Sequence, residues 1–304
     1  MNQIALNEGL SQISLFFIYG AMAVYTLAFL GFASHLARLS SEKSANRDSA
    51  SKLERVGIAL MILAVLLHGT GVMLRGIAAS RVPWANMYEF SITGSLVVVM
   101  IFLFALIIKD LRLLATFVSG FTLLILGGAT SAFYVEVSSL MPALQSYWLV
   151  IHVTVAVLST AFFNIAAGLA IAYLVRESEW VKKGKNSASA IFRRVLKVFP
   201  ESEKLERLSY RFNVVGFILW SFTLIAGAIW AERAWHRYWG WDTKEVWTFI
   251  IWTIYAGYLH ANATRGWSGK RSAWLALVGF AAILFNFTIV NLFFKGLHTY
   301  SGLK

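Results

Sequence analysis

The sequence predicts an all-α integral membrane protein, a helical bundle of about eight membrane-spanning helices. Hydrophobic residues make up 58% of the 304 residues and charged residues 14%, whereas about a quarter of a soluble domain is charged. Apolar stretches of roughly 20 residues, the length that crosses a bilayer as a helix, recur along the chain. Neither a soluble domain nor an internal repeat interrupts them, so we expect residues 1–304 to form one domain in the lipid bilayer.

Eight apolar segments account for these stretches, and polar connections join them. They lie near residues 12–33, 56–77, 90–108, 113–134, 148–175, 211–231, 246–262 and 273–294. The residues before the first segment, MNQIALNEGLSQ, lack the basic stretch of a cleavable signal peptide. We therefore expect the first segment to be a span and not a signal.

Basic residues predict the orientation of the bundle. Four alternate connections hold 20 of the 27 lysines and arginines, namely 34–55, 109–112, 176–211 and 263–272. Because such residues collect on the cytoplasmic side, we expect these connections in the cytoplasm and both termini outside, in the periplasm or its equivalent. The net charge of +12 then reflects topology. No nucleic-acid partner is expected, since no folded basic domain is present.

The longest polar insertion, the cytoplasmic basic loop 176–210, contains a helical pattern of its own. In SAIFRRVLKVF, apolar residues recur with a spacing that suits an amphipathic helix on the inner leaflet of the membrane.

One connection on the outer side is rich in tryptophan. The segment IWAERAWHRYWGWDTKEVW, between the sixth and seventh spans, holds five of the twelve tryptophans, which are Trp230, Trp235, Trp239, Trp241 and Trp247. An interfacial aromatic belt is one interpretation, because indoles collect at membrane surfaces. The other is a platform for a flat ligand, and the histidines favour it.

Two of the six histidines fall at the membrane level of this loop. His152 lies near the outer end of the fifth span, and His298 lies just past the eighth. Two imidazoles beside a broad aromatic surface could take the two axial positions of a heme iron. The indoles would cover the porphyrin, and Arg233, Arg237 or Lys244 would meet its propionates. Heme is thus the candidate ligand.

The other histidines have less specific settings. His260 follows Asp242 by 18 residues, so a helix would carry it about 27 Å inward, close to the cytoplasmic side. His68 falls near the middle of the second span, where an ionisable residue is either functional or bonded within the helix bundle. His35 begins a basic connection and is expected to be solvated.

Four segments resemble a known family. WAERAWHRYWGWDTKEVW resembles the WWD domain, and PWANMYEF resembles an outer loop of the form P-x-x-N-x-Y-E. SYWLVIHV and GLHTYSG match the two segments that carry the family's external histidines. Over nearly its whole length the chain resembles the cytochrome c biogenesis proteins of the CcsA (ResC) type, the heme-handling membrane component of system II.

The resemblance implies roles for these residues. His152 and His298 would be axial ligands of an externally presented heme b, and the WWD outer loop 230–247, with Asp242, would form its platform. His260 would ligate a second heme inside the membrane, with the other ligand supplied by a separate CcsB (ResB)-type membrane subunit, and His68 could line that inner site.

The same resemblance implies the reaction. Heme would be transported outward and joined to the Cys-x-x-Cys-His motif of apocytochrome c, in a holocytochrome c synthase complex. This chain would act by positioning heme, since no general acid or base is evident. It has no cysteine, which fits this role because a free thiol could compete for heme.

Two positions depart from the family pattern, and other functions stay open. His236 stands where glycine is usual, and Thr243 stands where proline is usual, which predicts a looser turn. His236 could ligate iron, bond a propionate or face water. The alternatives to a synthase component are a heme exporter or chaperone, a system I-like heme delivery protein, and a non-heme transporter with an aromatic belt.

Overall fold

The computed structural model describes residues 8–39, 45–138, 140, 144–196, 199–264 and 266–298. Over these residues the chain forms helices and no strand, which confirms the predicted all-α bundle. In order they are α1 (Glu8–Leu39), α2 (Ala45–Ala79), α3 (Met87–Ile108), the short 3-10 helix η1 (Arg112–Leu114), α4 (Ala115–Ala132), α5 (Tyr147–Arg176), α6 (Glu179–Lys183), α7 (Ser187–Leu196), α8 (Ser202–Trp235), α9 (Thr243–Thr264), α10 (Lys270–Phe287) and α11 (Ile289–Phe293).

Seven stretches of the described chain are long and apolar enough to cross a membrane. They correspond to the first six predicted spans and the eighth, of which the fourth and the eighth were predicted one or two residues too long at the C-terminal end. The remaining predicted span, 246–262, lies inside α9, which has 22 residues. Because of its tryptophan, tyrosine, asparagine and histidine residues, α9 has no stretch as apolar as those seven, so its crossing of the bilayer stays a prediction.

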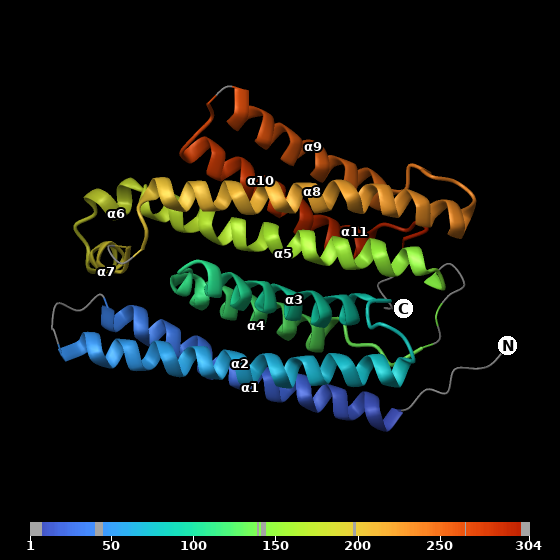
Figure 1. Ribbon diagram of the computed structural model, residues 1–304, viewed down its shortest axis with the longest axis horizontal. Helices are drawn as coiled ribbons and strands as arrows, with labels where there is room; N and C mark the ends of the chain where they lie inside the picture. The colour runs from blue at the N-terminus through green and yellow to red at the C-terminus, as the bar shows by residue number, and fades with distance from the viewer. Residues whose placement is uncertain are drawn as a thin grey trace.

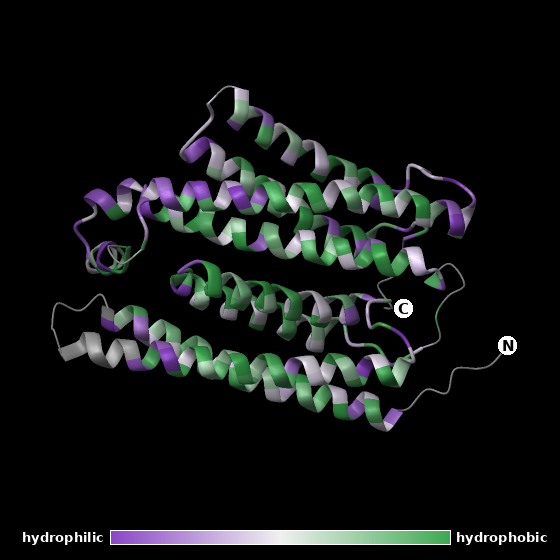
Figure 2. Cartoon of the chain, viewed as in Figure 1, coloured by the Kyte–Doolittle hydropathy of each residue, from purple (hydrophilic) through white to green (hydrophobic). Residues whose placement is uncertain are grey.

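The long helices run side by side in a flattened bundle (Figure 1). α1 and α2 pair along one edge, α9 and α10 lie at the opposite edge, and α5 packs against α8 between them. Hydropathic colouring shows apolar residues along the helices and polar residues gathered on α6, α7 and the helix ends (Figure 2). This distribution is the one that a bilayer around the helices requires.

α5 and α8 are in close contact because small and hydroxyl residues line their interface. Ser159 Oγ donates to the Gly216 carbonyl at 2.7 Å, and Ser209 Oγ donates to the Ala166 carbonyl at 3.0 Å. Gly216 also makes room for the ring of Phe163. These contacts fix α8 against α5 over much of its length. They therefore determine which side chains each helix directs toward the interior.

The connections sort into two groups at the two ends of the bundle. The end of α1, the start of α2, the α3–α4 connection and the end of α9 share one end with α6 and α7, whereas the α2–α3 and α8–α9 connections and the start of α5 lie at the other (Figure 1). The first group holds the basic connections. We call the second end the outer end, although its facing the periplasm stays a prediction.

His35 corrects one expectation. It was expected to be solvated, but only 5% of it is exposed. Its Nε2 lies 3.2 Å from Glu54 Oε2 on α2, and Glu54 also accepts a hydrogen bond from Arg112 of η1. The imidazole therefore ties α1 to α2, and the Glu54 carboxylate ties α2 to the α3–α4 connection.

Candidate functional site

A cavity of about 270 Å³ lies inside the bundle between α3, α5, α8 and α10 and reaches the α8–α9 loop. Its walls are mainly apolar. His152 and His298 both line it. An apolar cavity with a few convergent polar groups is the usual form of a site for a small molecule or cofactor.

His152 is presented by the beginning of α5. Ser146 caps this helix by accepting a hydrogen bond from the Trp148 amide at 3.3 Å. His152 Nδ1 lies 3.0 Å from the Thr223 carbonyl oxygen on α8. A carbonyl oxygen only accepts, so Nδ1 carries the hydrogen and Nε2 keeps its lone pair. The imidazole also stacks on the Trp230 indole, with 5.8 Å between centroids.

His298 approaches the same indole from the C-terminal segment. Its ring centroid lies 5.4 Å from that of Trp230 and 4.9 Å from that of Trp235, edge to face in both cases. Nδ1 lies 3.4 Å from Asp242 Oδ1. A carboxylate only accepts, so this contact favours the tautomer of His298 that carries its hydrogen on Nδ1.

The structure thus brings together two histidines that are 146 residues apart in the sequence. Their centroid separations of 5.8 Å and 5.4 Å from Trp230 place the two imidazoles at most about 11.2 Å apart. In each, Nδ1 faces a carbonyl or a carboxylate. Metal-binding histidines commonly donate this second N–H to such an acceptor, which fixes the tautomer and the ring direction.

Asp242 connects the tryptophan loop to His298. Its Oδ1 accepts from the Lys244 amide at 2.8 Å, and Glu245 Oε2 accepts from the Asp242 amide at 3.1 Å. Asp242 thus caps the start of α9 through the second residue of the helix, and Glu245, the third, bonds back to the Asp242 amide as in a capping box. The other oxygen, Oδ2, accepts from the Leu297 amide at 2.7 Å. Burial opposes ionisation of Asp242, but the bonds from His298, Lys244 and Leu297 outweigh it and lower its pKa to about 2.

The five tryptophans of the loop have different settings. Trp230 is buried between the two histidines, Trp235 touches His298, and Trp239 lines the cavity. Trp241 is 79% exposed, and it meets Trp239 at 5.9 Å between centroids. Trp247 packs on Phe285 of α10, with 4.4 Å between centroids, and contributes to the core. The site therefore gathers three of the five indoles.

The three candidate cations also differ. Arg233 and Arg237 are exposed. Among the described residues that line the cavity, Lys244 is the one basic side chain besides the histidines. Its Nζ donates to the Asn286 carbonyl at 2.7 Å and to Asn291 Oδ1 at 3.0 Å. Burial lowers the pKa of Lys244 to about 7, and the nearby Asp242 charge opposes this only in part. The amine held at the cavity wall by α10 and α11 is therefore partly neutral near pH 7.

The structure does not bring His260 and His68 together. His260 is exposed on α9, and His68 is fully buried on α2, at the opposite edge of the bundle (Figure 1). Nδ1 of His68 lies 3.4 Å from the Tyr25 hydroxyl. Neither histidine is among the described residues that line the cavity.

His236 ends α8 in the left-handed conformation, with φ 57° and ψ 34°. Glycine is the usual residue at such a helix end because it has no Cβ to strain the backbone. The structure therefore explains why glycine would be usual at this position. The side chain is exposed and lies outside the cavity lining.

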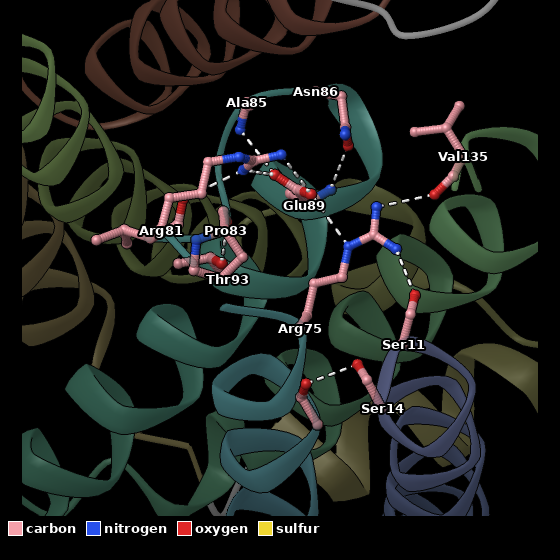
Figure 3. Close-up of polar contacts among 12 residues, drawn as sticks. Ser11, Ser14, Arg75, Arg81, Pro83, Ala85, Asn86, Glu89, Thr93 and Val135 are labelled. Atoms are coloured by element: carbon pink, nitrogen blue, oxygen red, sulfur yellow. Dashed lines mark hydrogen bonds and ion pairs between the residues drawn. The ribbon is translucent and has the colours of Figure 1, made fainter. Parts of the chain in front are cut away.

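Sequence reasoning missed the group that holds the α2–α3 loop. Glu89 is fully buried and binds Arg75 Nε at 3.0 Å and Arg81 Nη2 at 3.1 Å, and it also accepts from the Ala85 amide at 3.0 Å (Figure 3). Asn86 caps α3 by accepting from the Glu89 amide at 2.9 Å. A buried carboxylate needs such partners.

Arg75 extends this cluster to two further parts of the chain. Nη1 donates to Ser11 Oγ on α1 at 3.0 Å, and Nη2 donates to the Val135 carbonyl after α4 at 2.8 Å (Figure 3). The loop that is held in this way supplies Trp84, Ala85 and Asn86 to the cavity wall. The signal in the sequence was an acidic residue at the start of an apolar segment with two arginines just before it.

Comparison with known proteins adds to this geometry. Residues 79–298 match the family described as "Cytochrome C assembly protein". Three relatives carry the name "Cytochrome c biogenesis protein CcsA". A protein from Prochlorococcus marinus is 36% identical, covering 95% of this chain and 97% of that protein. The Guillardia theta protein is 36% identical (82% and 86%), and the Cyanophora paradoxa protein 32% identical (94% and 94%).

A solved structure shares the fold. "Cytochrome c Heme Lyase CcmF" superposes with a TM-score of 0.65 at 16% sequence identity, and the match covers 94% of this chain and 47% of that chain. This chain therefore spans about half the length of that protein. At this identity the likeness concerns the arrangement of the helices.

Proposed function

The chain belongs to the cytochrome c assembly protein family and is of the CcsA type, and from this membership we propose that it holds heme b at the outer end of the bundle for attachment to apocytochrome c. It is a multi-pass membrane protein. The proposal places it in the bacterial inner membrane with the outer end in the periplasm, where apocytochrome c would be the protein substrate.

The observation that carries this proposal is the pairing of His152 and His298 across Trp230. Heme, when bound, supplies an iron with two axial positions and a flat apolar macrocycle. The donor set fits it, because in each imidazole Nδ1 faces an acceptor oxygen, and both imidazoles line a cavity that is mainly apolar. His152 and His298 would hold the iron.

Other residues would bind the rest of the macrocycle. Trp230, Trp235 and Trp239 supply the aromatic surface, and Asp242 holds His298 in place. Lys244 at the cavity wall suits a propionate better than Arg233 or Arg237 does, because both arginines are exposed. The chain would then act by positioning, as a component of a holocytochrome c synthase.

The setting of His260 supports the proposal of a separate partner chain of the CcsB (ResB) type. This histidine is exposed on α9, whereas His152 and His298 line the cavity and His68 is buried on α2, at the opposite edge of the bundle. An inner heme at His260 would therefore take its other ligand from a separate chain that packs on α9. The buried setting of His68 favours a structural hydrogen bond with Tyr25 in place of a heme ligand.

Absorption spectra of the protein purified with its partner test the ligands. We expect His152→Ala and His298→Ala each to weaken a low-spin heme signal. His236→Ala serves as the control, because it removes an exposed imidazole from the same loop. Unchanged spectra in both ligand variants would rule the assignment out.

A Cys-x-x-Cys-His peptide separates the synthase proposal from a heme exporter or chaperone. With that peptide and heme, the purified pair should form thioether-linked heme. A pair that binds heme through His152 and His298 and forms no such product would favour the exporter or chaperone.

A further inference from the structure

Three residues of α8 surround the His152 ring. Thr223, Gly227 and Trp230 are spaced by four and three residues, so they lie on one face of the helix. The Thr223 carbonyl accepts from His152 Nδ1, and the Trp230 indole stacks on the imidazole. Gly227 lies between them and also lines the cavity.

Gly227 lets the ring come this close. A Cβ atom at this position would lie 2.8 Å from His152 Cε1 and 2.9 Å from Nδ1, nearer than real Cβ contacts come. Glycine is a poor residue for the interior of a helix, so a glycine well inside α8 calls for a packing reason. Contact with the imidazole is that reason.

Two contacts hold the His152 ring in its present position. A shift away from α8 lengthens the Nδ1 hydrogen bond to Thr223, which is 3.0 Å. It also separates the imidazole from the Trp230 indole, on which it stacks at 19°. Any side chain at position 227 would thus displace the imidazole that lines the cavity.

We propose that Gly227 is a positioning residue for the heme ligand His152, acting through the notch that its missing side chain leaves on α8. This inference rests on the proposed function and adds to it a residue that acts through the ligand. Together with Thr223 and Trp230, Gly227 sets the tautomer, the ring plane and the depth of His152.

The test compares Gly227→Ala with a matched control, Gly216→Ala. Gly216 lies on the same helix, and a Cβ there would come 2.8 Å from the ring of Phe163, also on α5. Both variants force an aromatic ring of α5 away from α8, but Phe163 is no ligand. We expect similar losses of melting temperature in the heme-free proteins.

Heme binding should separate the two variants. We expect Gly227→Ala to weaken heme binding by about ten- to a hundredfold, as changes beside a metal ligand do, and to reduce the low-spin absorption signature. Gly216→Ala should bind within about twofold of the unchanged protein. Equal heme loss in both variants, or an unchanged affinity and spectrum in Gly227→Ala, would overturn the proposal.

A double variant keeps the test decisive if Gly227→Ala folds poorly. In His152→Ala/Gly227→Ala the ring is absent, so the added methyl group should cost no stability and no further heme affinity relative to His152→Ala. A further loss would show that Gly227 acts otherwise. If His152→Ala itself binds heme normally, the proposed function fails and this inference fails with it. If His152→Ala loses heme but Gly227→Ala binds heme normally, this inference alone fails.

Discussion

At the scale of single residues, Asp242 does more than any other polar side chain of the site. It starts α9, accepts from the Leu297 amide and faces His298 Nδ1. Gly296 allows this arrangement, because a Cβ there would collide with Asp242 Oδ2. The aspartate of the WWD segment is therefore both a helix cap and an orienting group for an imidazole.

We expect Asp242→Asn to weaken heme binding by about ten- to a hundredfold, because the amide lacks the charge that fixes the His298 tautomer. Heme titration followed by absorption measures this. Asp110→Asn is the control, since Asp110 is an exposed carboxylate that binds Arg112 at the opposite end of the bundle. An Asp242→Asn variant with the unchanged affinity would remove Asp242 from the site.

The low pKa of Asp242, about 2, also predicts a pH dependence of stability. A carboxyl group whose pKa falls on folding, here from an ordinary value of about 3.9, stabilises the fold above that value and loses its effect as the pH falls through about 2. We expect the stability difference between the unchanged protein and Asp242→Asn, on the order of 1–2 kcal/mol, to stay constant from about pH 5 to pH 8. It should shrink below about pH 4, as thermal melts across this range would show; a difference that grew on acidification would contradict it.

The left-handed backbone conformation of His236 is unfavourable for a residue with a Cβ atom, and glycine at this position would remove that free-energy cost. Because its φ is 57°, we expect His236→Gly to raise the free energy of unfolding by roughly 0.5–1 kcal/mol and to leave the heme spectrum unchanged. Thermal melts and spectra of the two proteins measure both effects. A lost low-spin signal would instead identify His236 as a ligand.

At the scale of elements, buried charge joins helices that the hydrophobic effect alone would not align. Arg75 of α2 and Glu89 of α3 are almost fully buried, and Ser11 brings in α1. Both carboxylate oxygens of Glu89 have partners. The cluster thus sets the position of the α2–α3 loop, and through it one wall of the cavity.

We expect Glu89→Gln to destabilise the protein by about 3–5 kcal/mol, because it leaves two buried arginines without their carboxylate. Glu179→Gln is a matched control: Glu179 pairs with Lys183 on the surface, where such a pair contributes about 0–1 kcal/mol. Thermal unfolding in detergent compares the two variants. Equal and small changes in both would mean that the buried cluster does not support the fold.

At the scale of the whole molecule, apolar periodicity predicted the helices well. The predicted span 148–175 nearly coincides with α5, and most other spans lie inside longer helices, because a helix continues past the bilayer. Membrane level also predicted that His152 and His298 lie at one end of the bundle, and in the structure both rings contact Trp230.

Lateral contacts could not be predicted in the same way. The pairing of His35 with Glu54 and the notch at Gly227 depend on how helices rotate against one another. A single sequence records only position along each helix. Arg75, Arg81 and Glu89 are visible as charges next to apolar segments, but nothing in their spacing shows that they meet.

The orientation of the whole molecule is open to a direct test, because the chain has no cysteine and a single introduced one is unique. Tyr238 in the α8–α9 loop is 65% exposed at the outer end, and Ser187 is exposed at the start of α7, at the basic end. We expect a membrane-impermeant maleimide to label Tyr238→Cys in spheroplasts, which expose the periplasmic face, and Ser187→Cys only after the membrane is opened. The reverse pattern would place the cavity on the cytoplasmic side, where it could not meet an exported apocytochrome c.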